Sequence, residues 1–138
     1  AVQWGAIDQN PAREVTRFRL APRRRYVSDA DFRAVYAAAE PMVQCAMDLA
    51  VLTGLRRADL LGLTRASLTD DGIAVATGKT GKALVILWSD ELRAVVKRAL
   101  GLPPHTRQAL IANRRGRPYT PDGFSSQFRK ALQRAPQE

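Results

Sequence analysis

Arg56 lies two residues after Gly54, and Gly54 follows a long, nearly all-apolar stretch. A buried helix would give its guanidinium a fixed origin, which a clamp on a phosphate requires. Arg56 is therefore a candidate phosphate ligand. The alternative is that residues 54–57 only cap a helix C-terminus, with an arginine that complements the helix dipole.

A second cationic feature is the glycine-rich segment 77–82, which carries Lys79 and Lys82. Two lysines that flank a glycine-rich turn can reach into a groove as flexible point charges. The alternative is an ordinary solvated turn. The segment is not a nucleotide-binding P-loop, because Gly78-Lys79-Thr80 lacks the upstream glycine at the required spacing and no helix pattern follows.

A third cationic feature, the basic turn of residues 113–118, lies just before a helix start at Thr120. Its cations are Arg114, Arg115 and Arg117. Helix N-termini and arginine clusters are ready sites for phosphate. A solvated loop explains the same residues equally well.

Capping and spacing signals predict the elements that would position these residues. Ser28, with Asp31 three residues later, predicts the start of a first helix. Pro41 suits the first turn of a second helix over 42–53, whose nearly all-apolar side chains predict burial on almost every side. Gly54 ends that helix or marks a sharp bend, and a short third helix follows it.

The second half of the chain predicts a hairpin and two further helices. Two strands, 73–76 and 83–88, flank the lysine segment. Ser89 starts a helix, Thr120 starts the last one, and residues 110–112 suggest a short third strand. We therefore expect a mainly α domain with a small antiparallel β-hairpin, an α+β fold.

The charge of the chain favours an anionic partner. Lysine and arginine number 22 against 13 acidic residues, for a net charge of +9. Most of the cations are arginines, whose planar fork grips phosphate. The excess lies in residues 1–27 and 104–138, and the first of these segments, a linker by its composition, carries Arg23, Arg24 and Arg25. A pair of solvated basic tails is the alternative.

Composition excludes several classes of protein. No apolar run is long enough to span a membrane, and no signal peptide is visible at the N-terminus. The single cysteine, Cys45, excludes an internal disulfide framework, and its apolar surroundings predict an inert core residue. One histidine and one cysteine also argue against a zinc site. We expect no metal and no small-molecule cofactor.

The chain resembles the tyrosine recombinases, the phage integrase family, in two motifs. These are the run LAVLTGLRRADLLGL at 49–63, with its Thr-Gly-Leu-Arg box, and the Gly-Lys hairpin at 77–82. The flanking segments agree. Residues 4–11 resemble the end of the family's core-binding domain, 28–39 the opening helix of its catalytic domain, and 118–128 the segment before its second catalytic box.

The resemblance implies an enzyme that cuts and rejoins DNA without a metal or high-energy cofactor, through a 3′-phosphotyrosyl link. It implies that Arg56 holds the non-bridging oxygens of the scissile phosphate and that Lys79 donates a proton to the leaving 5′-oxygen. Asp59 stands where the family usually has Glu, and it would orient the arginine or buttress the site. The residues that we assign to DNA binding are Arg23, Arg24, Arg25, Arg57, Lys82, Arg114, Arg115 and Arg117.

Two motifs of the family do not occur in the chain. Its His-x-x-Arg box and its nucleophilic tyrosine belong after the last helix, and Tyr26, Tyr36 and Tyr119 all come too early to be that nucleophile. We therefore expect residues 1–27 to be the end of the core-binding domain and the inter-domain linker. Residues 28–138 would be the N-terminal portion of the catalytic domain.

The expected function is that of a fragment of a site-specific recombinase of phage or prophage type. By itself it would bind duplex DNA weakly without cleaving it. Its parent would act with other protomers in a synaptic complex, in the bacterial cytoplasm at the nucleoid. The alternatives are a non-enzymatic DNA-binding module or inactive integrase remnant, and a helical protein–protein adaptor whose arginines serve solubility.

The recombinase interpretation makes two structural predictions. Arg56 and Lys79 should open onto one concave surface, with Asp59 nearby. Apolar surface should also be exposed where the helices that complete the domain would pack.

Overall fold

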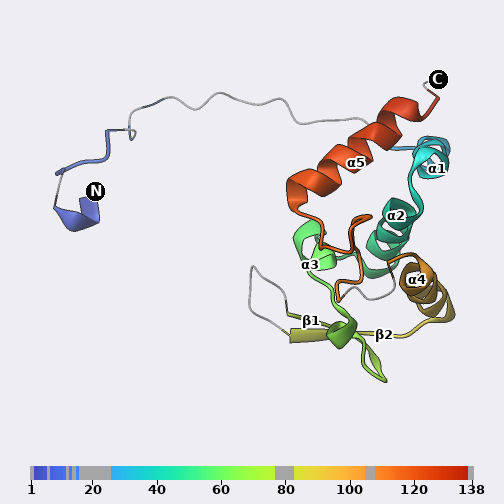
Figure 1. Ribbon diagram of the computed structural model, residues 1–138. Helices are drawn as coiled ribbons and strands as arrows, with labels where there is room; N and C mark the ends of the chain where they lie inside the picture. The colour runs from blue at the N-terminus through green and yellow to red at the C-terminus, as the bar shows by residue number, and fades with distance from the viewer. Residues whose placement is uncertain are drawn as a thin grey trace.

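Helices and one hairpin form the part of the chain that the computed structural model describes, which is residues 2–5, 7–11, 13, 15, 26–76, 83–104 and 108–136. Figure 1 shows the helices above a small two-stranded sheet. This arrangement confirms the expected fold class. In chain order the elements are η1 (Val2–Trp4), α1 (Asp29–Ala38), α2 (Pro41–Thr53), α3 (Arg57–Leu61), η2 (Arg65–Ser67), β1 (Gly72–Ala76), β2 (Ala83–Leu87), α4 (Asp90–Gly101) and α5 (Pro121–Arg134).

The helices begin at the predicted caps. Ser28 Oγ accepts a hydrogen bond from the Asp31 amide at 3.1 Å, and the Asp31 carboxylate accepts one from the Ser28 amide at 3.2 Å. This reciprocal pair is the capping box of α1. Ser89 caps α4 and Thr120 caps α5 in the same manner, each through its hydroxyl oxygen.

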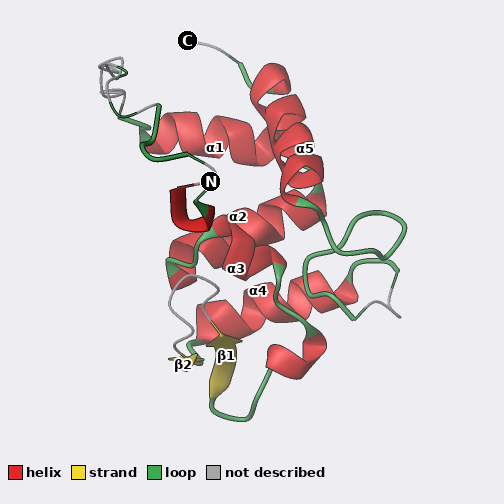
Figure 2. Cartoon of the chain, turned by 90° about the vertical axis from the view of Figure 1, so that its left-hand side faces the viewer, coloured by secondary structure: helices red, strands yellow, loops and turns green. Residues whose placement is uncertain are grey.

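Helix α2 lies between α1 and α5 on one side and α3 and α4 on the other (Figures 1 and 2). It contributes to two apolar cores. One side of it, with Cys45 and Leu49, packs with α3, β1 and α4. The other side, with Val43 and Met47, packs with α1 and α5. The prediction of burial on almost every side is wrong for the last turn, where Val51 is 68% and Leu52 is 41% exposed. No helix in the described ranges is both long enough and apolar enough to cross a membrane.

Strands β1 and β2 pair antiparallel, with Gly72 opposite Leu87 and Ala76 opposite Ala83. This confirms the predicted hairpin. Gly72 is required by a close approach of the two strands, because a Cβ atom there would collide with the backbone carbonyl of Ile86. The buried side chains of β1, Ile73 and Val75, join the same core as α3. The base of the hairpin is therefore fixed relative to α3.

The predicted third strand at residues 110–112 is wrong. The segment is fully buried, but within the described ranges Ala112 forms a single bridge, with Pro118, and the preceding residue Ala109 forms another, with Thr64. The Leu110 amide donates to the Leu63 carbonyl at 2.8 Å, which holds the segment beside the chain that leaves α3. The apolar side chains of residues 110–112 therefore fit a buried core segment and not a strand of a hydrogen-bonded sheet.

An apolar hollow of about 490 Å³ opens between α2, α3 and α5. Leu55, Phe124 and Phe128 line it, and so does Leu132, which is 44% exposed. The exposed turn at the end of α2 adds to the same apolar character. Exposed apolar surface is therefore present, and that further helices of the domain pack there stays a prediction.

Candidate functional site

Arg56 is held at the bend between α2 and α3 by its neighbours. Gly54 ends α2 in the left-handed region, with φ of 63°, and its amide donates to the Ala50 carbonyl. The Thr53 hydroxyl donates to the Leu49 carbonyl at 2.5 Å and accepts from the Leu55 amide at 3.3 Å. The Leu55 side chain packs against the larger core. The backbone that enters Arg56 is therefore fastened on both sides of the bend.

Arg56 itself is the N-cap residue of α3, and its side chain is exposed. Its carbonyl accepts a hydrogen bond from the Leu60 amide at 2.9 Å. Within the described ranges its guanidinium makes no hydrogen bond or ion pair. A cation on a rigid origin that is open to solvent is the arrangement that a phosphate ligand needs.

Asp59 lies in the first turn of α3, three residues after Arg56, and it is half-buried. Asp59 has a hydrogen-bonding or electrostatic partner in the structure. Arg56 and Asp59 thus belong to the same end of the same short helix. That the two side chains act in one site stays a prediction.

The two lysines of the hairpin tip, Lys79 and Lys82, lie outside the described residues, as do Arg23, Arg24 and Arg25. The expected convergence of Arg56 and Lys79 on one surface therefore stays a prediction. What the structure describes is the pair of strands that carries the tip. These strands share a core with α3.

Arg57 engages α5. Its Nη1 atom donates to the Ser125 hydroxyl at 2.7 Å, across a separation of 68 residues, and that hydroxyl donates to the Pro121 carbonyl at 2.8 Å. Arg57 also lines the apolar hollow between α2, α3 and α5. Two adjacent arginines therefore have different surroundings: Arg57 bridges two helices, whereas Arg56 has no partner within the described ranges.

The basic turn is an ordered structure rather than a loose loop. Asn113 Oδ1 accepts from the amides of Arg115 and Arg117, at 2.9 and 3.2 Å. Arg114 pairs with Glu40, its Nη2 atom at 2.7 Å from Oε1 and its Nε atom at 3.3 Å from Oε2. The side chains of Arg115 and Arg117 are exposed.

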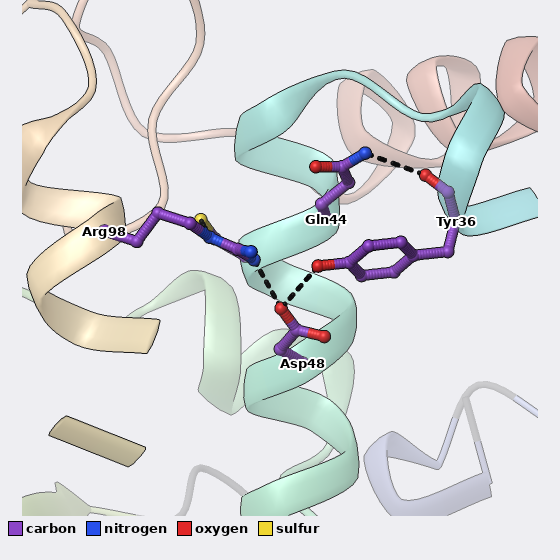
Figure 3. Close-up of polar contacts among 5 residues, drawn as sticks. Tyr36, Gln44, Asp48 and Arg98 are labelled. Atoms are coloured by element: carbon purple, nitrogen blue, oxygen red, sulfur yellow. Dashed lines mark hydrogen bonds and ion pairs between the residues drawn. The ribbon is translucent and has the colours of Figure 1, made fainter. Parts of the chain in front are cut away.

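A polar network joins three helices, and sequence reasoning missed it (Figure 3). Asp48 on α2 accepts a hydrogen bond from the Tyr36 hydroxyl at 2.8 Å and pairs with Arg98 on α4. Arg98 Nε also donates to Cys45 Sγ at 3.2 Å. The available signal was Asp48 and Gln44, which interrupt an otherwise apolar helix one turn apart.

Burial and charge in this network shift two pKa values. Burial, the largest cause, raises the pKa of Tyr36 above its ordinary value, and the Asp48 carboxylate acts in the same direction. The hydrogen bond to Cys45 raises the pKa of Arg98. The network is therefore suited to holding α1, α2 and α4 together. The Tyr36 hydroxyl stays protonated at neutral pH.

The two other tyrosines and the cysteine lie in different environments. Tyr119 packs edge-on against Phe124, with ring centroids 5.7 Å apart, and burial raises its pKa. Tyr26 is 82% exposed, ahead of α1. Cys45 is free and fully buried, as predicted. Among the described residues no group of three or more histidine, cysteine or acidic side chains could hold a metal ion.

The fold belongs to a known class of proteins. A family model described as the phage integrase family matches residues 26–138, so the chain belongs to the phage integrase family. Among curated proteins, the integrase of Escherichia phage HK022 is 30% identical in an alignment 139 residues long, which covers 95% of this chain and 39% of that protein.

Solved structures of lambda integrase share the fold. The lambda integrase catalytic core superposes with a TM-score of 0.66 at 28% identity, over 76% of this chain and 70% of that one. A lambda integrase tetramer bound to a Holliday junction superposes with a TM-score of 0.77 at 24% identity, over 96% of this chain and 42% of that one. The chain thus spans about two fifths of the longer relatives that it matches.

Proposed function

We propose that this chain is part of a site-specific recombinase that breaks and rejoins duplex DNA through a tyrosine, and that it contributes half of the active site. The relatives support the proposal, since one solved form of lambda integrase is a dimer bound to a COC′ core site. On this proposal the partners are duplex DNA and further protomers. The protein then works in the bacterial cytoplasm, at the nucleoid or on phage DNA.

The observation that carries the proposal is the setting of Arg56. Its backbone is fastened by Gly54 and Thr53, while its guanidinium is exposed and unpaired within the described ranges. In the proposed site this guanidinium binds the non-bridging oxygens of the scissile phosphate and stabilises the charge of the transition state. Asp59, three residues on in α3, orients this arginine when DNA is bound or buttresses the site. Lys79, carried by the β1–β2 hairpin, protonates the leaving oxygen.

The division of the chain follows the same proposal. Residues 28–138 are the N-terminal portion of the catalytic domain, and residues 1–27 are the end of a core-binding domain with its linker. The family match, which begins at residue 26, supports this boundary. Of the proposed DNA contacts, Arg23, Arg24, Arg25 and Lys82 are assigned from sequence alone.

None of the three tyrosines of the chain is suited to be the nucleophile. The Tyr36 hydroxyl is committed to Asp48, and Tyr119 packs against Phe124. Tyr26 precedes α1, whereas the nucleophile of the family belongs after the last helix. We therefore propose that the 138-residue chain binds DNA but does not cleave it.

Titration of a labelled duplex at two salt concentrations tests DNA binding against the adaptor alternative. Contacts to phosphates release counterions, so the affinity should fall steeply as salt rises. An adaptor whose arginines serve solubility should bind barely at all at either salt concentration. Failure to bind at low salt would overturn the proposal.

Two further experiments test the catalytic part. A suicide duplex that traps a covalent intermediate should give no adduct with this chain on a denaturing gel, and an adduct would show that one of its tyrosines is reactive. The reading frame of the source gene beyond Glu138 should encode a His-x-x-Arg box and a later tyrosine. A stop codon directly after Glu138 would favour a non-enzymatic DNA-binding module.

A further inference from the structure

The basic turn presents its backbone in one fixed form. Asn113 is the organising residue: its side-chain oxygen accepts from two amides, and its own amide donates to the Arg117 carbonyl at 2.9 Å. Gly116, with φ of 75°, takes the left-handed position that closes the turn. The turn therefore holds the two arginines that flank Gly116 at a set spacing.

The turn is also fastened to a distant part of the fold. Arg114 binds Glu40 through both nitrogens of one edge of its guanidinium, across 74 residues of chain. Glu40 is the N-cap residue of α2, yet its side chain makes no capping hydrogen bond. Its carboxylate is thus available to Arg114, and this pair clamps the turn onto the start of α2.

The two remaining arginines of the turn, Arg115 and Arg117, face a hollow of about 540 Å³ beside the C-terminal end of α3, where Gly62 lies. Both side chains are exposed. In the described part of the chain neither guanidinium makes a hydrogen bond or an ion pair. Arg114 therefore fastens the turn, whereas its two neighbours are open to an anion.

The spacing relates this turn to the Arg56 site. Arg56 starts α3, and Gly62 directly follows it and lines the hollow. At 1.5 Å of rise per residue, the two ends of α3 lie roughly 9 Å apart. This separation is short beside one turn of a duplex, which is about 34 Å along its axis. The distance between the two places is therefore no obstacle to their contact with one duplex.

We propose that the basic turn is a second phosphate-binding element of the recombinase. In it Arg115 and Arg117 contact the DNA backbone, and Arg114, Glu40 and Asn113 are positioning residues. The inference rests on the proposed function, and it assigns unlike roles to three arginines that sequence reasoning treated alike. The DNA contacts carry no base information, because phosphate contacts fix register and orientation only.

Glu40→Gln provides a test whose sign is decisive. The substitution removes one negative charge and leaves the side-chain shape unchanged. If only net charge mattered, the variant would bind duplex DNA more tightly. The positioning role predicts the opposite, because release of Arg114 frees the turn. We expect affinity at fixed salt to fall roughly threefold, because a freed turn must be ordered when DNA binds.

Three further variants complete the set. Asn113→Ala changes no charge and should weaken binding by a similar factor. Arg115→Ala should weaken binding and reduce the slope of log K against log salt by about 0.9, the value for one phosphate. The double reversal Glu40→Arg with Arg114→Glu keeps the net charge and restores an ion pair, so it should recover affinity relative to either single reversal. Asp70→Asn, an exposed acid in the turn before β1, is the matched control for loss of one negative charge.

The outcomes separate the two proposals. If the unsubstituted chain does not bind duplex DNA, both proposals are overturned. A different result would overturn the positioning role alone. In it the unsubstituted chain binds duplex DNA, Glu40→Gln and Asn113→Ala bind as tightly as that chain or more tightly, and Asp70→Asn binds slightly more tightly. Unchanged binding and an unchanged salt slope in Arg115→Ala would remove the turn from the DNA interface. Thermal melting of each variant checks that a loss of affinity is not a loss of fold.

Discussion

The hydroxyl of Tyr36 on α1 donates a hydrogen bond to Asp48 on α2, at 2.8 Å, and Arg98 on α4 pairs with the same carboxylate oxygen. Three helices thus meet at one oxygen atom (Figure 3). Asp48 is partly buried, with 24% of its side chain exposed. Loss of either partner would leave the remaining groups incompletely satisfied.

Replacement of Tyr36 by phenylalanine should lower the free energy of unfolding by about 1 kcal/mol, the usual net value of one hydrogen bond. The ring itself remains in place against Phe32, 6.0 Å away between centroids. Urea denaturation measures the change. Tyr26→Phe, at an exposed position, is the matched control and should leave stability unchanged. An equal effect in both variants would mean that the contact with Asp48 contributes nothing.

The same contact should give a pH dependence at the alkaline end. Tyr36 has a pKa raised above 10.0 in the folded protein, so the folded state holds its proton more tightly than the unfolded chain. Its stabilising contribution is complete below pH 10 and is lost as the pH rises through the raised value.

Denaturation curves at pH 8 and at several pH values above 10 measure this dependence. The stability difference between the parent chain and Tyr36→Phe should shrink as the pH rises. A difference that grows in that range would contradict the raised pKa.

Two glycines should differ in their response to alanine for a physical reason. At Gly54 a Cβ meets no atom within 4 Å, but φ is +63°. Gly54→Ala should therefore cost only the left-handed backbone penalty of about 1–2 kcal/mol. At Gly72 the added Cβ would strike the Ile86 carbonyl of β2.

Gly72→Ala should therefore break the start of the hairpin and cost more than Gly54→Ala. Thermal melting ranks the two variants, and Gly62→Ala, with no contact closer than 3.4 Å, is the control. Because Gly54 also fastens Arg56, its variant should lose DNA affinity as well as stability. A Gly72 variant as stable as the Gly62 variant would contradict the close approach of the strands.

Short-range signals predicted the helix boundaries well, because caps are chemically local. Ser28, Ser89 and Thr120 each bind an amide three residues on, so spacing alone identifies them. Patterns of burial were less reliable. The apolar run at 110–112 resembles a strand but is a core loop, and the last turn of α2 is apolar yet exposed. Apolar composition does not say which neighbour covers a side chain.

The candidate site was predicted only where its residues are close in the chain. Arg56 and Asp59 were found together because one turn of α3 joins them. The pairs of Arg57 with Ser125 and of Arg114 with Glu40 are separated by 68 and 74 residues. No local spacing rule reaches that far, and tertiary packing alone brings such partners together.

The central claim is that the Arg56 guanidinium contacts a DNA phosphate, and the salt dependence of binding tests it most directly. Arg33→Ala is the matched control, because Arg33 is exposed on α1, which Figure 1 shows on the opposite side of α2 from α3. Arg56→Ala should weaken duplex binding and reduce the slope of log K against log salt by about 0.9, and Arg33→Ala should leave that slope unchanged. Equal slopes for the parent chain and Arg56→Ala would contradict the account.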